Sequence, residues 1–192
     1  VDLEGARVLH ITGIPAALSK SCREATYRLI ERAREKDMLV SFDPNLRPTL
    51  WESEEVMIQT INDIASKADI VLPGTGEGKI LMGSEKPEEI AEFYRKNGAK
   101  AVIIKAGGDG AYADWEGGKA FYHGYKVKEV VDTVGAGDGF AVGILSAWLE
   151  GKQMPEMVDR GNAIGSIQVS VASDNEGLPT KEELDAYMKG AK

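Results

Sequence analysis

The sequence contains very little cysteine and histidine. Cys22 is the single cysteine among 192 residues, so no disulfide can form within the chain, which fits the reducing cytoplasm. Cys22 itself is better explained as a small, buried or half-buried helix residue than as a nucleophile. The two histidines, His10 and His123, have no Cys or His partner at metal-binding spacing. We therefore expect no transition-metal site.

Long apolar runs and an excess of basic residues are missing as well. No stretch approaches about 18 uninterrupted apolar residues, so we expect neither a transmembrane helix nor a membrane partner. The formal net charge of −8 argues against nucleic acid as a partner. It is compatible with an anionic nucleotide, because a phosphate site needs local backbone amides and metal ions. The first five residues lack an initiator Met, a basic segment and an apolar signal core, so we expect a truncated or processed chain.

The remaining composition is that of a globular α/β protein. Hydrophobic residues make up 43% and charged residues 28%, and the length suits a single domain over residues 1–192. Short apolar runs alternate with helical patterns, which predicts crossover connections and a mostly parallel sheet. We expect strands at residues 7–11, 38–42, 69–72, 101–105 and 127–131, and a hairpin at 110–115 and 119–123. We expect helices at residues 19–35, 52–67, 87–97, 138–149 and 154–171, and a last one opened by a capping box at Thr180.

The strongest motif lies at residues 132–138 and reads Asp-Thr-Val-Gly-Ala-Gly-Asp. Its glycines let backbone N–H groups approach a ligand closely, and the helix that follows adds unpaired donors and a partial positive charge. Together these features predict an anion hole for a phosphate. Asp138, in the first helical turn, could accept a proton from an attacking hydroxyl. The alternative is that Asp138 only stabilises the helix start.

This string resembles the signature of the ribokinase (PfkB-type) family of carbohydrate kinases. The resemblance implies a ribokinase-like three-layer α/β/α fold with a C-terminal β-hairpin, and ATP-dependent phosphorylation of a sugar hydroxyl. It implies that Asp138 is the catalytic base and that the amides of Gly135, Ala136 and Gly137 hold the transferring group. It also implies ATP and Mg²⁺ as cofactors. Family members often use K⁺ near the anion hole, although no residue here indicates it.

A second motif supports the same resemblance. Residues 105–111 read Lys-Ala-Gly-Gly-Asp-Gly-Ala and connect a buried strand to a glycine-rich turn. In the family a similar turn lies beside the nucleotide, although Lys105 alone could equally be a solvated strand end. The nucleotide-binding residues implied by the resemblance are Lys105, Gly107, Gly108, Gly110, Asn45 and Asn162.

A third motif concerns the metal. The family often has Asn-x-x-Glu after the strand at residues 69–72, and the Glu organises Mg²⁺ and its waters. Here Gly74 replaces the Asn and Glu77 remains, so the resemblance carries over Glu77 only. The competing explanation is an ordinary glutamate in the first turn of a helix.

The substrate residues follow from two further segments. Residues 43–51 read Asp-Pro-Asn-Leu-Arg-Pro-Thr-Leu-Trp and resemble the branch of fructokinases and 2-keto-3-deoxygluconate kinases. Arg47 could bind a substrate carboxylate bidentately, or form a loop salt bridge. In the loop at residues 173–179, Asp174 is the candidate for a sugar contact, with a turn-forming Asp as the alternative. We take 2-keto-3-deoxygluconate as first choice and fructose as second.

The resemblance also predicts what the chain lacks. Family members are usually longer, and the N-terminal strands and lid that carry most sugar contacts have no counterpart here. We therefore expect the catalytic part of a longer cytoplasmic kinase that forms homo-oligomers at full length. A nucleotide-binding module that keeps the fold without catalysis is the alternative from a different functional class.

Overall fold

The computed structural model describes residues 2–173 and 175–190, and the chain divides into two compact units. The first unit comprises Val1–Ile104 and Asp114–Lys119, and the second comprises Lys105–Ala113 and Ala120–Lys192. The single domain expected over residues 1–192 stays a prediction. No helix within the described ranges has the length and apolarity that crossing a membrane requires.

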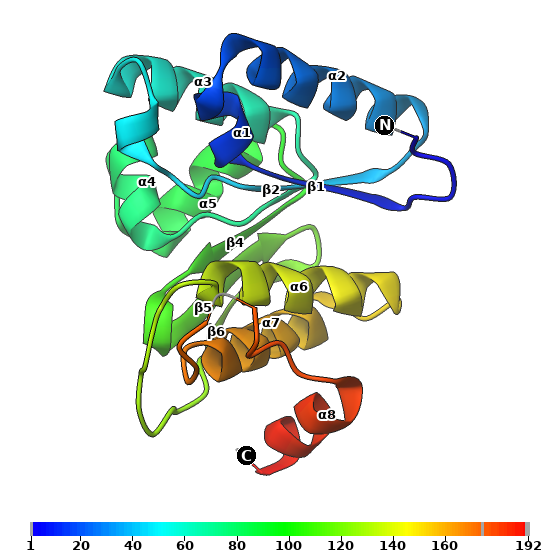
Figure 1. Cartoon of the computed structure of the whole chain (residues 1–192), viewed down its shortest axis with the longest axis vertical. Coiled ribbons are helices and arrows are strands. Elements are labelled where there is room, and N and C mark those ends of the chain that lie inside the picture. The colour runs from blue at the N-terminus through cyan, green and yellow to red at the C-terminus, as the bar shows by residue number, and fades with distance from the viewer. Residues whose placement is uncertain (1, 174, 191–192) are drawn as a thin grey trace. The chain divides into compact units, whose positions relative to one another are not determined.

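The strands form one mostly parallel sheet, as predicted (Figure 1). Its strand order is β1-β2-β3-β4-β5-β6, and β1 to β4 pair in parallel, with Val8 opposite Leu39 and Ile70 opposite Ala101. The bounds are β1 Val8–Thr12, β2 Leu39–Asp43, β3 Ile70–Val71, β4 Ala101–Lys105, β5 Gly110–Trp115 and β6 Gly118–His123. Two residues join β5 to β6, which is the connection of a β-hairpin.

Helices connect the strands of the first unit and make up most of the second. The first unit holds α1 Gly13–Leu18, α2 Lys20–Glu35, α3 Glu54–Ser66, α4 Thr75–Met82, α5 Pro87–Lys96 and the 3-10 turn Pro48–Leu50. The second holds the 3-10 turn Gly107–Asp109 and the helices α6 Ala136–Leu149, α7 Met154–Gln168 and α8 Lys181–Gly190. Five of these helices begin within two residues of the predicted positions, and α8 begins directly after the predicted cap Thr180. We did not predict α1 and α4.

Side-chain caps explain where several helices begin. The hydroxyls of Ser19 and Ser53 accept hydrogen bonds from backbone N–H groups in the first turns of α2 and α3, which lack intrahelical acceptors. Thr180 and Glu183 form the predicted capping box: the Thr180 N–H donates to Glu183 at 2.8 Å and the Glu183 N–H donates to Thr180 at 3.3 Å.

The strand predicted at residues 127–131 is wrong. These residues are irregular in the structure, and Val130 and Val131 are exposed. A strand buries one face against a sheet, and these valines have no such cover. Their backbone is fixed instead at one point, where the Val131 N–H donates to the Val169 carbonyl at 2.8 Å.

Close helix packing builds the second unit. A Cβ atom added to Gly143 of α6 would lie 2.6 Å from the Cα atom of Gly161 in α7, so only glycine permits this approach. Ala163 and Ile164 of α7 are also buried in one cluster with Leu184 of α8. The helix that carries Asp138 is therefore held firmly against its neighbour.

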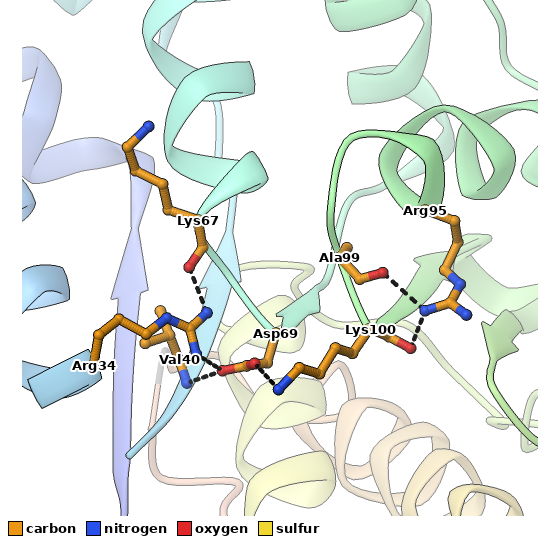
Figure 2. Close-up of polar contacts among 7 residues, drawn as sticks. All are labelled: Arg34, Val40, Lys67, Asp69, Arg95, Ala99 and Lys100. Carbon is orange, nitrogen blue, oxygen red and sulfur yellow. Dashed lines mark hydrogen bonds and ion pairs between the residues drawn. The ribbon is translucent and has the colours of Figure 1, made fainter. Parts of the chain in front are cut away.

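A buried carboxylate joins three strands of the first unit at their amino ends (Figure 2). Asp69, just before β3, is 3% exposed and accepts the Val40 N–H of β2 at 2.8 Å. Its carboxylate also pairs with Arg34 of α2 at 2.6 Å and with Lys100, just before β4, at 2.9 Å. Burial alone would raise the pKa of Asp69, but the Val40 N–H, Lys100 and Arg34 outweigh it and lower that pKa.

A second buried carboxylate extends this network. Asp114 of β5 pairs with Arg95 of α5 at 3.3 Å and with Lys119 at 2.9 Å. Arg95 also donates to the Ala99 carbonyl at 2.8 Å and to the Lys100 carbonyl (Figure 2). Two buried carboxylates, at the amino end of β3 and near the carboxyl end of β5, thus have their charges compensated by cations.

Candidate active site

The loop that follows β2 carries two of the predicted site residues in a constrained conformation. Asp43, the last residue of β2, is buried, and its Oδ1 accepts the Asn45 N–H at 3.2 Å. Asn45 has φ = +40°, the left-handed region that asparagine tolerates better than other side chains. The loop lies at the carboxyl end of a parallel strand, where open α/β sheets place their ligands.

Glu77 connects this loop to the next one along the sheet. Its Oε1 accepts the Leu46 N–H at 2.9 Å, and its Oε2 accepts the Gly74 N–H at 2.7 Å. Gly74 follows β3 and directly precedes α4, so one half-buried carboxylate spans the loops after two adjacent strands. A carboxylate that accepts two backbone N–H bonds is held more firmly than an exposed helix glutamate.

Neighbouring helices fix the position of α4. Asn62 of α3 donates to the Leu81 carbonyl at 2.9 Å and accepts a hydrogen bond from the buried Tyr94 hydroxyl at 3.0 Å. A Cβ atom on Gly78 would lie 2.2 Å from the Ile90 Cδ1 atom, so α4 and α5 touch at a glycine. Burial raises the pKa of Tyr94, and the negative charge of Glu77 raises it further.

Arg47 is exposed and stays beside its own loop. One guanidinium nitrogen, Nη1, donates to the Leu46 carbonyl at 2.9 Å. A guanidinium has five N–H donors, so this bond leaves others for a ligand. The alternative that we considered, a loop salt bridge, has no counterpart among the ion pairs of the described residues.

In the second unit, the glycine-rich motif forms the start of α6. Gly135 is the N-cap with φ = +76°, and Ala136 begins the helix. The Ala136 N–H donates to the Thr133 carbonyl at 3.3 Å, and the structure records no backbone acceptor within the described residues for the N–H groups of Gly137 and Asp138. Asp138 is exposed in this first turn. The arrangement has the donors and the carboxylate that the sequence predicted.

The turn after β4 is held tightly against the end of β6. Gly107 and Gly110 have φ of +60° and +120°, and a Cβ atom on Gly110 would lie 2.1 Å from the Tyr122 carbonyl oxygen. The Gly124 N–H donates to the Asp109 carbonyl at 2.9 Å. Gly108 is exposed and Lys105, at the end of β4, is half-buried. The glycines here are required by space and by backbone conformation, and their predicted contact with a nucleotide stays a prediction.

Asn162 of α7 supports the same region. Its side chain is buried, and its amide nitrogen donates to the carbonyls of Tyr122 at 3.1 Å and His123 at 3.3 Å. Both amide hydrogens thus bind the backbone at the end of β6. Its predicted contact with the nucleotide stays a prediction, and the observed hydrogen bonds show that it supports the backbone at the end of β6.

The structure brings some of the predicted residues into contact with neighbouring site segments. In the first unit Glu77 contacts the loop that holds Asn45 and Arg47, and in the second Asn162 contacts the strand end beside the glycine turn. Asp174 lies outside the described residues. Sequence reasoning missed Leu46, whose backbone links Glu77 to Arg47, because a backbone contact leaves no signal in the residue type.

The candidate site offers few protein ligands for a metal ion. Within the described residues no group of three or more His, Cys, Asp or Glu side chains could hold one. Glu77 is the predicted organiser of Mg²⁺, and its two oxygens already accept backbone hydrogen bonds. The residues present therefore fit an ion held mainly by phosphate oxygens and water, with a carboxylate nearby.

Comparisons with known proteins point in one direction. The model of the "pfkB family carbohydrate kinase" matches residues 2–181. The 2-dehydro-3-deoxygluconokinase of Bacillus subtilis strain 168 is 48% identical over 180 residues, which are 94% of this chain and 56% of that protein. A PfkB protein from Polaromonas sp. JS666 is 47% identical with a TM-score of 0.84, over 94% of this chain and 57% of that one.

A more distant structure contains ligands. Aminoimidazole riboside kinase from Salmonella enterica, complexed with aminoimidazole riboside and an ATP analog, is 27% identical with a TM-score of 0.87. The match covers 94% of this chain and 62% of that one. The present chain thus spans little more than half the length of the proteins that it resembles.

Proposed function

Because the chain belongs to the pfkB family of carbohydrate kinases, we propose that the protein containing it transfers the γ-phosphoryl group of ATP to a hydroxyl of a sugar acid. The substrate that we propose is 2-keto-3-deoxygluconate, the compound also called 2-dehydro-3-deoxygluconate. The proposal takes its support from the 48% identity to an enzyme of that name and from the site geometry. Fructose is the second candidate.

The observation that carries the proposal is the start of α6. An exposed carboxylate, Asp138, stands in the first turn of a helix capped by a left-handed glycine. Neutral N–H donors and a carboxylate at one helix end suit a reaction in which a hydroxyl loses a proton while a phosphoryl group gains contacts. A carboxylate that only stabilises a helix needs neither the glycines nor the exposure.

In the proposed reaction Asp138 accepts the proton of the attacking hydroxyl. The hydroxyl oxygen forms a bond to the γ-phosphorus while the bond from that phosphorus to the bridging oxygen of ADP breaks. The backbone N–H groups of Gly135, Ala136 and Gly137 hold the equatorial oxygens of the transferring group. The glycine turn at Gly107, Gly108 and Gly110, with Lys105, Asn45 and Asn162, would bind the nucleotide.

Metal and substrate complete the proposal. Mg²⁺, when bound, would offset the charge of the triphosphate, with Glu77 organising its waters. Arg47 would bind the substrate carboxylate through the N–H donors that its loop leaves available, and Asp174 would contact the sugar. K⁺ would bind near the anion hole, and assays with and without K⁺ test this. The enzyme would act in the cytoplasm as a homo-oligomer.

The test uses the complete protein with ATP, Mg²⁺ and a panel that includes 2-keto-3-deoxygluconate and fructose. We expect phosphorylation of the keto acid, and a loss of about 10²- to 10⁴-fold in turnover for Asp138→Asn, because the variant cannot accept the proton. Asp185→Asn, which removes an equal charge from an exposed position of α8, is the matched control and should keep wild-type turnover.

Two outcomes would contradict the proposal. Wild-type turnover in Asp138→Asn would remove Asp138 from its role as base. ATP binding without phosphorylation of any sugar on the panel would favour the alternative, a nucleotide-binding module without catalysis.

A further inference from the structure

The Leu46 peptide is held from both sides. Its N–H donates to Glu77 Oε1 at 2.9 Å, and its carbonyl accepts Arg47 Nη1 at 2.9 Å. Glu77 is therefore connected to the guanidinium of Arg47 through a single residue of the chain. Arg47 comes from the loop after β2, and Glu77 comes from the first turn of α4, which follows the adjacent parallel strand β3.

Glu77 is the fixed member of this arrangement. It sits on α4, which Asn62 binds through the Leu81 carbonyl and which packs on α5 where Gly78 meets Ile90. Its second oxygen accepts the Gly74 N–H at 2.7 Å, so the carboxylate cannot turn away without breaking a short bond.

The loop is the dependent member. Asn45 adopts a left-handed conformation that costs free energy for a residue other than glycine, and it persists only where neighbours hold it. The bond from the Asn45 N–H to Asp43 is long, at 3.2 Å, whereas the Leu46 N–H makes the shorter bond to Glu77. Arg47 itself is exposed, and within the described residues its side chain makes a single hydrogen bond, to the Leu46 carbonyl.

We propose that Glu77 is a positioning residue for the substrate: through Leu46 it sets the loop that presents Arg47 to the carboxylate of the sugar acid. This inference rests on the proposed function and differs from the metal role predicted for Glu77. Its specific consequence is that loss of Glu77 weakens the binding of the substrate carboxylate, and that it does so through Arg47.

Binding and kinetics of the complete protein test this consequence. Glu77→Gln keeps one acceptor oxygen and replaces the other by an NH₂ donor, so one of the two backbone bonds is lost. We expect Kd and KM for 2-keto-3-deoxygluconate to rise about tenfold, in line with the loss of one such bond. The Kd for fructose, which has no carboxylate, should stay unchanged, whereas the metal role that we propose for Glu77 would show separately in the Mg²⁺ concentration for half-maximal rate. A shifted Mg²⁺ dependence with unchanged sugar-acid binding would overturn the proposal.

A double-mutant cycle makes the test sharper. If Glu77 acts through Arg47, then Glu77→Gln should add little to the weakened sugar-acid binding of Arg47→Ala. Independent, multiplying effects of the two substitutions would contradict the proposal. Glu85→Gln is the matched control, because Glu85 is an exposed acid three residues after the end of α4. It pairs with Lys79 of that helix, and no hydrogen bond or ion pair of the described residues joins it to the loop.

Hydrogen exchange separates this inference from the proposed function. In Glu77→Gln or Glu77→Ala the Leu46 N–H should exchange faster than in the wild type, while Glu85→Gln leaves it unchanged. This readout needs no turnover, so it decides the contact even if the wild-type protein phosphorylates no sugar. Unchanged exchange at Leu46 in both Glu77 variants would overturn the proposal, whatever the kinetics.

Discussion

The two ends of the parallel strands in the first unit use carboxylates in different ways. At the amino ends of β2 to β4, Asp69 is buried and faces two cations, as does Asp114 near the carboxyl end of β5. At the carboxyl ends, Glu77 accepts two backbone N–H groups from separate loops, and no cation of the described residues forms an ion pair with it. The first arrangement holds strands together, whereas the second shapes a loop that carries Arg47.

This difference separates stability from function along one sheet. A carboxylate compensated by cations contributes to the free energy of unfolding and has no donor or acceptor to offer a ligand. A carboxylate bound to loop amides contributes less to the free energy of unfolding, but it controls where a neighbouring side chain lies. Variants that remove a carboxylate from one end of the strands test this difference, if each is measured for its free energy of unfolding and for its binding of the sugar acid.

The largest effect on stability should come from Asp69→Ala. The variant leaves the Val40 N–H and two cations without their shared partner, and we expect a loss of about 2–4 kcal/mol in the free energy of unfolding. Urea titration followed by circular dichroism measures it. Asp63→Ala, which removes an exposed acid paired with Lys67 at 2.7 Å, is the control and should cost about 0.5 kcal/mol or less.

Wild type and Asp69→Ala also test whether the two ends of the strands act separately. In the complete protein, folded Asp69→Ala should bind 2-keto-3-deoxygluconate as the wild type does, because Asp69 lies at the opposite ends of the strands. Weakened sugar-acid binding at a temperature where the variant is folded would show that the two ends are not separate.

The contribution of Asp69 should also depend on pH. Its pKa is lowered in the folded state, so its stabilisation is complete above the ordinary carboxyl pKa of about 4 and is lost as pH falls through the lower folded value. The difference in unfolding free energy between wild type and Asp69→Asn should therefore shrink in that acidic window. Urea titrations from pH 7 to pH 2 measure it, and a difference that grows on acidification would contradict the sign.

The smallest effect concerns the two cations. Arg34 donates to Asp69 and to the Lys67 carbonyl at 2.7 Å, whereas the side chain of Lys100 is 79% exposed. A lysine cannot make both bonds of the guanidinium, so Arg34→Lys should cost about 1 kcal/mol. Lys100→Met should cost about 0.5 kcal/mol or less, because the ammonium group of Lys100 lies in solvent, where water and salt screen its charge. If urea titration gave the two variants equal losses in the free energy of unfolding, the second hydrogen bond of the Arg34 guanidinium would not contribute to stability.

Local patterns predicted much of the fold. The strand at residues 101–105 agrees with β4 at both ends, since its Val-Ile-Ile run is buried on both faces. The helices α1 and α4 were missed because each is short and begins at or beside glycine, which is typical of turns. The segment at residues 127–131 has apolar residues without a neighbouring strand to pair with, and alternation alone does not reveal that.

The sequence predicted which residue types form the site, but it did not predict the contacts between residues that are far apart in the chain. The glycines and Asp138 lie together in the sequence, so their place at one helix start followed from the motif. Glu77 and Leu46 are far apart in the sequence, and Asp69 meets Arg34 and Lys100 across three elements. Such pairs depend on how parallel strands align, which no local pattern contains.

Gly13 limits how this site could be redesigned. It lies directly after β1, and a Cβ atom there would stand 2.1 Å from the Pro44 carbonyl oxygen and 2.6 Å from Ile61. Its backbone angle is not left-handed, so the requirement for glycine comes from space alone. A library that randomises residues 45–47 to change substrate preference would therefore explore only those loop shapes that keep the Pro44 carbonyl against Gly13. The accessible specificities are thus limited by a residue outside the loop.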